Sequence, residues 1–587
     1  MEIRATSTFF VCGISYAFFC WALFAFYCIG YQINRLRVYY VRNKRIAGQE
    51  KVVETLPGSK FFSYFNYVVR IPFVTEMIAV KHIIGMFLFM VVNLLFILYA
   101  PFKMAEGQTF YLSSIGVFDR RAAFVGMVNW GFVFFLAQRN SVLPKMSGLT
   151  FEELIPFHRW VARVGLAEFI PHFVWRMYHI WDRTHIVKDV LFRNLEQTSG
   201  TIAMLGFLLM FVTSFEFVRR KFFEIFYYCH IIGVIVAIIF SCIHETTCFA
   251  FFIPAVVLWA FDRAVRSYQS WIVKTKAVRV DEVASTSATQ EGIFRVLFEY
   301  AGMVNFRPGQ YVFVSMARQG SKLLGYANWH PYTISEVFRL NQNLDSGIEE
   351  RVMEGSGPKE KGASSDINSL SDTSSLRRRA NVGYGEETTT TMASVHVKAL
   401  GKYTREILDA ASRNEPIAVS VDGPFGPQLQ YQDYPVLALF GTGIGITPAM
   451  AIVKDCVERR ASGIRTVSTE NIYLTWAVRS SEEILPFMDM FTYWHDHVNR
   501  AILPIHFSFT IFVTRMNEGP DYFDKMHGFN IVYGRRPDIV DSLQKVKTLS
   551  PHQRVWVHAC GPDSFTKSVV NEAVKHHFAA HNETFEF

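Results

Sequence analysis

Six apolar runs with the character of membrane spans constrain this chain more than any other feature of its sequence. They lie at about residues 8–31, 82–101, 121–138, 199–218, 222–243 and 248–262. About 20 apolar residues in a helix cross the ~30 Å hydrocarbon core of a bilayer. A seventh segment, residues 151–180, is interrupted by charged residues and also fits an interfacial amphipathic helix. We expect a multi-pass α-helical membrane bundle of about seven spans.

The composition adds a soluble half to this membrane half. Hydrophobic residues make up 50% of the 587 residues and charged residues only 19%, which excludes a disordered or simply hydrophilic chain. The eight cysteines form no CxxC pair and predict neither a disulfide framework nor a cysteine metal site. The net charge of +8 comes without a basic block interleaved with aromatic residues, so we expect no nucleic-acid partner.

The basic residues between the spans predict the orientation. Nine Arg and Lys residues lie between the first two runs, from Arg35 to Lys81. Because cytoplasmic loops carry an excess of Lys and Arg, we expect the N-terminus outside or in a lumen, and this loop and the C-terminal half in the cytosol. The 181–198 loop carries Arg183, Lys188 and Arg193 and argues mildly against this orientation.

Two histidine pairs with the same spacing lie inside these segments. His158 and His172 are fourteen residues apart, as are His230 and His244. Fourteen helical residues make about 3.9 turns and rise about 21 Å, so both members of a pair face nearly the same way, one near each leaflet. The two helices are the fourth and sixth expected spans and hence parallel. His158 is therefore expected level with His230, and His172 level with His244.

Two stacked bis-imidazole sites follow from this placement. Intramembrane ionisable side chains are costly and usually functional, and neutral imidazole is a haem ligand. Gly165 and Ala237, seven residues past each first His, leave room for a flat macrocycle. A single membrane His also fits a simple hydrogen bond between helices, but two identically spaced pairs favour two b-type haems. Bis-His iron has no open position, so such haems transfer electrons rather than activate O2.

From about Thr275 the sequence changes to short period-two strands, which predict a small β-barrel. Strands then alternate with helices, the pattern of an open, parallel, doubly wound nucleotide-binding sheet. A serine-rich stretch at residues 345–391 lacks apolar periodicity, and we expect a disordered surface loop there. The expected domains are 1–80, a first span with a cytosolic loop; 81–270, the haem-binding bundle; 271–430, the barrel; and 431–587, the nucleotide domain.

Chemically suggestive residues follow strands of the expected parallel sheet, at the edge where such folds bind ligands. The run FGTGIGITP, with Gly441, Thr442, Gly443, Gly445 and Pro448, opens a helix whose N-terminus favours a pyrophosphate. A glycine triplet alone also fits a plain turn.

The other clusters at this edge bear on the choice of nucleotide. Arg479 and Ser480 suit a ribose 2′-phosphate and favour NADPH over NADH, and Arg535 or Arg536 assists or is a surface charge. Cys560, Gly561 and Pro562 end the last strand and place a thiol near the reacting nicotinamide. A buried Cys before a helix-starting Gly-Pro is the alternative.

Together these motifs resemble the flavocytochrome b superfamily, the ferric and cupric metalloreductases with the NADPH oxidases. The resemblance rests on the His pairs, GTGIGITP and CGP, and on RPGQY, HPYTIS, GKYT, VDGPFG and an aromatic C-terminus. It implies a ferredoxin-reductase-type module, with an FAD-binding barrel and an α/β NADPH domain. The residues that it implies at the FAD site are Arg307, Gly309, Gln310, Tyr311, His330, Pro331, Tyr332, Thr333, Ile334, Ser335, Gly401 and Thr404. Phe587 matches the terminal aromatic that stacks on the flavin, with Phe585 as a rival.

The resemblance also implies the reaction. NADPH gives hydride to FAD in the cytosol, and electrons cross the membrane through the inner haem (His158, His230) and the outer haem (His172, His244). We expect Arg159 or Arg163 to pair with inner-haem propionates. The preferred acceptor is chelated Fe3+ or Cu2+, reduced for uptake by a partner ion permease or membrane subunit. The alternative is O2, giving superoxide.

Departures from the family pattern favour the metalloreductase branch. Arg176 stands where NADPH oxidases commonly carry a His, and the extra first span resembles fungal-type metalloreductases. The plasma membrane is the expected location, with the endoplasmic reticulum as the alternative. A non-enzymatic scaffold or transporter with a relic flavin fold is opposed by the intact nicotinamide, flavin and haem motifs.

Overall fold

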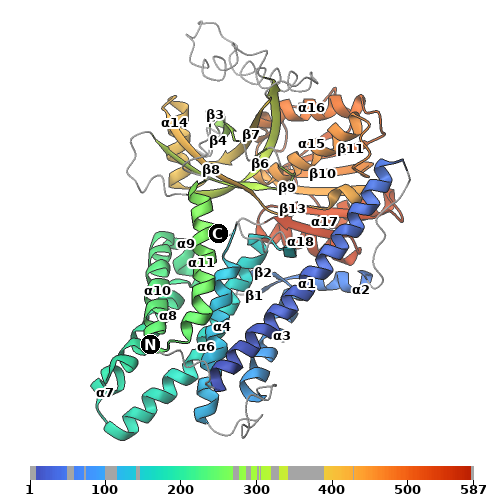
Figure 1. Cartoon of the computed structure of the whole chain (residues 1–587). Helices are drawn as coiled ribbons and strands as arrows, with labels where there is room; N and C mark the ends of the chain where they lie inside the picture. Colours follow the sequence, from blue (N-terminus) through green and yellow to red (C-terminus); the bar gives the residue numbers. More distant parts are fainter. Residues whose placement is uncertain are drawn as a thin grey trace. The chain divides into compact units, whose positions relative to one another are not determined.

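The computed structural model describes residues 8–48, 59–71, 75–99, 115–139, 146–268, 276–285, 292–300, 303, 306–318, 329–341, 389–427 and 429–583. The chain divides into two compact units (Figure 1). The first comprises residues 1–35, 72–74 and 81–266, and the second comprises residues 36–71, 75–80 and 267–587.

Long helices build the first unit. They are α1 (Thr8–Ile46), α3 (Val80–Tyr99), α4 (Ile115–Leu136), α6 (Phe151–Thr184), α8 (Leu195–Thr213), α10 (Phe223–His244) and α11 (Cys248–Ser267), with the short α7 (Val187–Phe192) and α9 (Glu216–Lys221). Five of them, α1, α3, α8, α10 and α11, are long and apolar enough to cross a membrane. The apolar runs are thus helical as expected. Residues 151–180, for which two interpretations were open, form a continuous helix that packs against α4.

A network of polar side chains joins four of these helices. The Tyr16 hydroxyl donates to Asn129 Oδ1 at 2.8 Å and lies 3.0 Å from Asn93 Oδ1. The Asn129 amide reaches Asn93 Oδ1 at 2.6 Å and Glu168 Oε2 at 2.8 Å. All four residues are buried. Since lipid offers no hydrogen-bond partners, polar groups must be satisfied internally, and this network favours one register of α1, α3, α4 and α6.

Small residues let neighbouring helices approach closely. A Cβ on Gly206 of α8 would lie 3.0 Å from the backbone nitrogen of Ala237, and one on Gly165 would lie 2.7 Å from the Trp130 ring. Such contacts are the usual basis of helix packing in membranes. Gly165 and Ala237 therefore have a role in packing α6 on α4 and α10 on α8, which differs from the macrocycle space expected from the sequence.

A curled antiparallel sheet forms the first part of the second unit. Its strand order is β3-β4-β7-β6-β5-β8. The strands are β3 (Lys276–Ser285), β4 (Gly292–Glu299), β5 (Tyr311–Arg318), β6 (Trp329–Asn341), β7 (Thr389–Lys398) and β8 (Ile417–Phe425), and helix α14 (Lys402–Ser412) precedes β8. Within the described residues no ladder joins β3 to β8, so the expected barrel is a curled sheet here.

The expected end of the serine-rich loop differs from the start of the next strand. Residues 342–388 lie outside the described residues, but 389–391, assigned to the loop from the sequence, begin strand β7. This boundary was wrong because the run TTT reads as a polar tract, whereas β-branched Thr suits a strand, and these three residues pair with β6.

The predicted doubly wound parallel sheet is present. Its order is β12-β11-β10-β9-β13-β14 and every ladder is parallel. The strands are β9 (Val436–Thr442), β10 (Asn471–Val478), β11 (His506–Val513), β12 (Phe529–Tyr533), β13 (Val555–Cys560) and β14 (Ala579–Glu583). Helices α15 (Thr447–Ala461) and α16 (Met488–Asn499) cover one face, and α17 (Ile539–Leu549) and α18 (Asp563–Lys575) the other.

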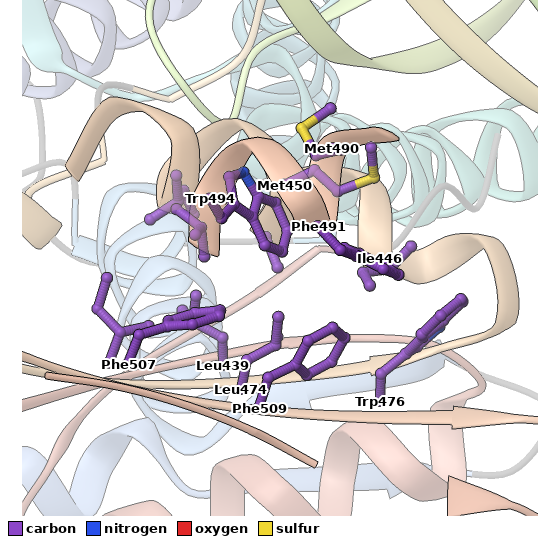
Figure 2. Close-up of a cluster of buried hydrophobic side chains, with 14 of the residues drawn as sticks. Leu439, Ile446, Met450, Leu474, Trp476, Met490, Phe491, Trp494, Phe507 and Phe509 are labelled. Atoms are coloured by element: carbon purple, nitrogen blue, oxygen red, sulfur yellow. The ribbon is translucent and has the colours of Figure 1, made fainter. Parts of the chain in front are cut away.

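Aromatic side chains fill the space between this sheet and its helices. Figure 2 shows Trp476 and Phe509 on the strands beneath Phe491 and Trp494 of α16. All four are completely buried. Burial of apolar area at roughly 25 cal/mol per Å² makes such large side chains the main source of stability for this layer.

The chain between the first two apolar runs also packs on the nucleotide domain. It contains the end of α1, then α2 (Ser59–Ser63), the 3-10 helix η1 (Tyr64–Asn66) and the hairpin β1 (Val68–Ile71) and β2 (Thr75–Ala79). Arg42 bonds Asp433 through Nη2 at 2.7 Å and Nε at 3.1 Å. The Asn571 side chain of α18 accepts from the Val68 N–H at 2.8 Å and donates to its carbonyl at 3.0 Å.

We predict that Asn571→Ala releases the β1–β2 hairpin from α18. Each lost hydrogen bond costs about 1 kcal/mol and leaves a backbone group of Val68 without its partner. Hydrogen–deuterium exchange on the detergent-purified protein is expected to rise in residues 68–79. Asn530→Ala, at an exposed position of β12, is the matched control and leaves exchange there unchanged. Unaltered exchange in Asn571→Ala would show that other contacts hold the hairpin.

Candidate functional site

The four equally spaced histidines form the two expected pairs between α6 and α10. The ring centroids of His158 and His230 are 6.3 Å apart, and those of His172 and His244 are 6.1 Å apart. A metal–imidazole bond is about 2.0 Å, so two rings on one metal have nitrogens about 4 Å apart and centroids about 6 Å apart. Both pairs fit an axial bis-imidazole site.

A cavity of about 470 Å³ adjoins the outer pair. Aromatic side chains line its apolar part, among them Phe124, Phe169, Phe173 and Phe207, and Arg120 and Arg176 also line it. An apolar body with nearby cations suits a flat macrocycle that carries carboxylates, so this cavity fits haem.

Two residues of this cavity were not singled out from the sequence. A Cβ on Gly200 would lie 2.7 Å from the His244 ring, so Gly is required beside this ligand. Arg120 of α4 lies over the Phe9 ring at 5.3 Å. The sequence could have indicated Arg120, because it belongs to a run of three charged residues at the start of an apolar helix. Arg163, expected near the inner pair, has its guanidinium 5.4 Å from the Trp160 ring.

The second ring nitrogens of the histidines have different partners. His158 Nδ1 lies 3.0 Å from the Val133 carbonyl, and His244 Nδ1 lies 2.7 Å from the Glu196 carbonyl. His172 Nδ1 instead lies 3.0 Å from Asp119 Oδ2. His230 Nδ1 has no partner among the described residues. Where Nδ1 donates to an oxygen, Nε2 is left as the ligand nitrogen.

The three motifs expected at the FAD site meet in the curled sheet. Strand β6, with HPYTIS, pairs with β5 so that Tyr311 of RPGQY faces Thr333. His330 lies against the ring of Tyr403 from GKYT, with centroids 5.0 Å apart. The Tyr403 hydroxyl donates to the Met316 carbonyl at 2.8 Å and accepts from its N–H at 2.9 Å. Burial raises the pKa of Tyr403 to about 12, so it is neutral.

Two glycines of these motifs have clear backbone roles. Gly309 has a φ of +87°, a conformation that L side chains rarely adopt, and it lets RPGQ turn into β5. Gly401 is the N-cap of α14, where the Thr404 hydroxyl accepts from its N–H at 3.2 Å. The remaining N–H groups at this helix end suit a pyrophosphate.

Not every residue of HPYTIS is available to a cofactor. Ile334 is completely buried in the core of the curled sheet, and the Ser335 hydroxyl lies 2.9 Å from His396 Nδ1. These two side chains shape the strand, whereas His330, Pro331 and Tyr332 are partly exposed.

At the nucleotide edge, the glycine-rich turn packs against CGP. Strands β9 and β13 are neighbours with Gly441 opposite Cys560. A Cβ on Gly445 would lie 2.6 Å from the Cys560 carbonyl, and one on Gly561 would collide with the Thr442 hydroxyl. Gly443 has a φ of +51°. Pro448 lies in the first turn of α15, whose N-terminus follows this turn.

An arginine follows each of three neighbouring strands at this edge. Arg479 follows β10, Arg515 follows β11 and Arg535 follows β12, and the Arg515 N–H donates to the Arg479 carbonyl at 3.1 Å. All three side chains are exposed. Arg515 was not singled out because only the pairing of β10 with β11 brings it beside Arg479. Ser480, next to Arg479, is partly exposed.

The thiol of Cys560 is surrounded by protein. It is 7% exposed, and burial, assisted by the nearby Glu583 carboxylate, raises its pKa well above the usual value. The group is therefore a neutral thiol at physiological pH. Glu583 stands opposite Cys560 in the β13–β14 ladder. Phe585 and Phe587 lie outside the described residues.

Comparison with known proteins identifies three related domains along the chain. Residues 122–241 match the family model "Ferric reductase like transmembrane component", residues 279–373 match "FAD-binding domain" and residues 434–574 match "Ferric reductase NAD binding domain". The first match contains His158, His172 and His230, and His244 lies three residues beyond it. In these three domains and their order, the chain is similar to the flavocytochrome b superfamily.

Several curated proteins resemble this chain. Ferric reduction oxidase 7, chloroplastic, of Arabidopsis thaliana is 24% identical over 68% of the chain and 47% of its own length. Ferric reduction oxidase 5 of Arabidopsis thaliana is 25% identical over 75% of the chain and 54% of its own length. A superoxide-generating NADPH oxidase heavy chain of Dictyostelium discoideum is 24% identical over 68% of the chain and 54% of its own length.

The chain spans about half the length of these relatives. Among solved structures, the FAD/NAD-binding domain of nitric oxide dioxygenase from Vibrio cholerae aligns with 53% of the chain, and with 98% of its own length, at 16% identity and a TM-score of 0.31. That likeness is too weak to carry an inference.

A histidine pair in β13 and β14 gives the protein a pH-dependent stability. His558 is completely buried, and its Nδ1 lies 3.1 Å from His581 Nδ1. Burial, with the neighbouring His581, lowers the pKa of His558 well below its usual 6.5. Below pH 6.5 the unfolded chain therefore binds a proton at this position that the folded chain does not, and stability falls as the pH decreases.

We predict that His558→Phe flattens the loss of stability between pH 6.5 and pH 5. The slope at one such group is at most about 1.4 kcal/mol per pH unit. The thermal unfolding midpoint of the detergent-purified protein, measured at several pH values, reports the change. His506→Phe, at an exposed position of β11, is the control and keeps the wild-type profile. Equal profiles for wild type and His558→Phe would contradict the prediction.

Proposed function

We propose that the chain is a transmembrane oxidoreductase that passes electrons from cytosolic NADPH, through FAD and two bis-histidine haems, to ferric or cupric ions on the opposite side of the membrane. One observation carries the proposal: two stacked pairs of facing imidazoles, with centroids 6.3 and 6.1 Å apart, in a chain that also carries FAD- and NAD-binding domains.

The proposal includes a topology of seven membrane spans. Helices α4 and α6 join the five most apolar helices as spans, although α4 carries Asp119, Arg120 and Arg121 in its first two turns. The proposed orientation has the N-terminus outside and the nucleotide and flavin domains in the cytosol, in the plasma membrane. A partner ion permease for uptake of the reduced ion belongs to the same proposal.

The side chains supply binding, orientation and shielding. His158 and His230 hold the inner haem, and His172 and His244 the outer one. Arg307, Gly309, Gln310, Tyr311, His330, Pro331, Tyr332, Thr333, Gly401 and Thr404 bind FAD, with Ile334 and Ser335 fixing the strand behind them. Gly441, Thr442, Gly443, Gly445, Pro448, Gly561 and Pro562 cradle the NADPH pyrophosphate.

The remaining residues serve the 2′-phosphate and the hydride step. Arg479, Ser480, Arg515 and Arg535 receive the 2′-phosphate through charge-assisted hydrogen bonds. Cys560, with its neutral and buried thiol, marks the strand end at which the nicotinamide binds, and Phe587 covers the flavin until the nicotinamide enters. Bound flavin turns a two-electron hydride into single electrons, and each haem iron carries one of them.

Fe3+ or Cu2+ is the preferred acceptor because several of the most similar relatives are named ferric reduction oxidases. The alternative acceptor is O2, since other relatives are named a dual oxidase and a superoxide-generating NADPH oxidase heavy chain.

We predict NADPH-dependent reduction of a ferric chelate by membranes that contain the protein. The absorbance of a ferrous chelator is followed with and without superoxide dismutase, and with and without oxygen, because superoxide itself reduces ferric chelates. Direct metal reduction persists under both changes and is lost in His244→Leu, which removes a haem ligand. Loss of iron reduction on adding dismutase or on removing oxygen would instead identify an oxidase.

We predict that Arg515→Ala selectively weakens the use of NADPH. Loss of a charge-assisted hydrogen bond, worth about 1.5–3 kcal/mol, raises the KM for NADPH roughly ten- to a hundredfold and leaves the KM for NADH nearly unchanged. Arg465→Ala, before the amino end of β10, is the matched control. Equal effects of Arg515→Ala on the two nucleotides would show that Arg515 does not read the 2′-phosphate.

A further inference from the structure

The two proposed haem sites differ in the groups behind their ligands. His158 and His244 direct Nδ1 to backbone carbonyls, which are neutral. His172 directs Nδ1 to the carboxylate of Asp119, at 3.0 Å. Among the four histidines, only His172 has an acidic hydrogen-bond partner in the part of the chain that the structure describes. The outer site is thus chemically distinct from the inner one.

Asp119 is held in place for this contact. It belongs to the first turns of α4 and is completely buried, whereas His172 and Arg176 lie one turn apart on α6. Arg176 reaches the same carboxylate oxygen through Nε at 3.1 Å and Nη2 at 3.0 Å. The buried carboxylate therefore accepts hydrogen bonds from both a guanidinium and an imidazole N–H, which fix its position.

We propose that Asp119 is a positioning residue that sets the orientation and the basicity of His172, and thereby lowers the reduction potential of the outer haem. This inference rests on the proposed function. A carboxylate that accepts the Nδ1–H of a ligand histidine fixes the ring and increases electron donation from Nε2. Greater donation and a nearby negative charge both stabilise the ferric over the ferrous state, and Arg176 limits the effect by sharing the carboxylate.

Two substitutions of Asp119 separate its effect on the orientation of the His172 ring from the effect of its charge. The planes of His172 and His244 meet at 72°, whereas those of His158 and His230 meet at 51°. Asp119→Asn keeps a hydrogen-bond acceptor for the ring but removes the charge. Asp119→Leu removes both, so the ring is free to turn. The low-spin EPR signal of bis-imidazole iron depends on the angle between the ring planes, and the potential depends on ligand basicity and charge.

The test is an optical redox titration with EPR of the purified, haem-loaded protein. In Asp119→Asn one of two midpoint potentials rises, with about a tenfold change in the redox equilibrium, which is about 59 mV for one electron. Arg176→Gln, which leaves the carboxylate to His172 alone, shifts the same potential in the opposite direction. Asp119→Leu also alters the EPR signal of that haem. Glu245→Gln, a carboxylate that lines the same cavity, is the control for charge acting through space, and its shift is smaller.

The outcomes are distinguishable. Wild-type protein without two low-spin haems would overturn the proposed function itself. Two haems whose potentials in Asp119→Asn equal those in Glu245→Gln would overturn the role of Asp119 and leave the proposed function intact. If Asp119→Asn fails to retain haem, Arg176→Gln is compared with Arg120→Gln, which removes another cation that lines the cavity. A larger fall in Arg176→Gln supports the inference, and equal shifts contradict it.

Discussion

The absence of water in the bilayer interior is the constraint on which the membrane unit depends. Every polar group placed there must find a protein partner. The Tyr16, Asn93, Asn129 and Glu168 network satisfies this condition across four helices. The same condition applies to the histidines, because a ring whose Nε2 faces a metal still has an Nδ1 that needs a hydrogen-bond partner. Two of them use backbone carbonyls, His172 uses Asp119, and His230 Nδ1 has no partner among the described residues. The partners thus hold three of the four rings and also make the two histidine pairs unequal.

The parallel sheet imposes a comparable order on the second unit. All its strands end at one edge, so residues that follow different strands meet there. Close approach of the backbones explains the glycines at this edge, since a Cβ on Gly445 or Gly561 would collide with the facing strand end. The same edge gathers Arg479, Arg515 and Arg535. Electrostatic recognition of a phosphate needs no precise side-chain packing, which is why exposed arginines can provide it.

Much of this arrangement follows from local sequence signals. Apolar length identified the helices, and a fourteen-residue spacing paired the histidines because the α-helix has a fixed rise and turn. Strand–helix alternation identified the parallel sheet. Residues 389–391 were misassigned because a Thr run carries little apolar pattern, and its strand state depends on pairing with β6. Gly165 and Ala237 were located correctly as small residues, but their contacts with other helices determine what they do.

The sequence by itself determined which residues can ligate haem, which glycines can approach a phosphate and how the chain divides into helical and strand-rich parts. These properties depend on periodicity and residue chemistry, which are local. Only the tertiary structure decided that Asp119 stands behind His172, that Arg515 lies beside Arg479, and that Ile334 is buried in the sheet core while Ser335 contacts His396. Each of these depends on contacts between segments distant in the chain, and the spacing of residues along one helix or strand carries no information about them.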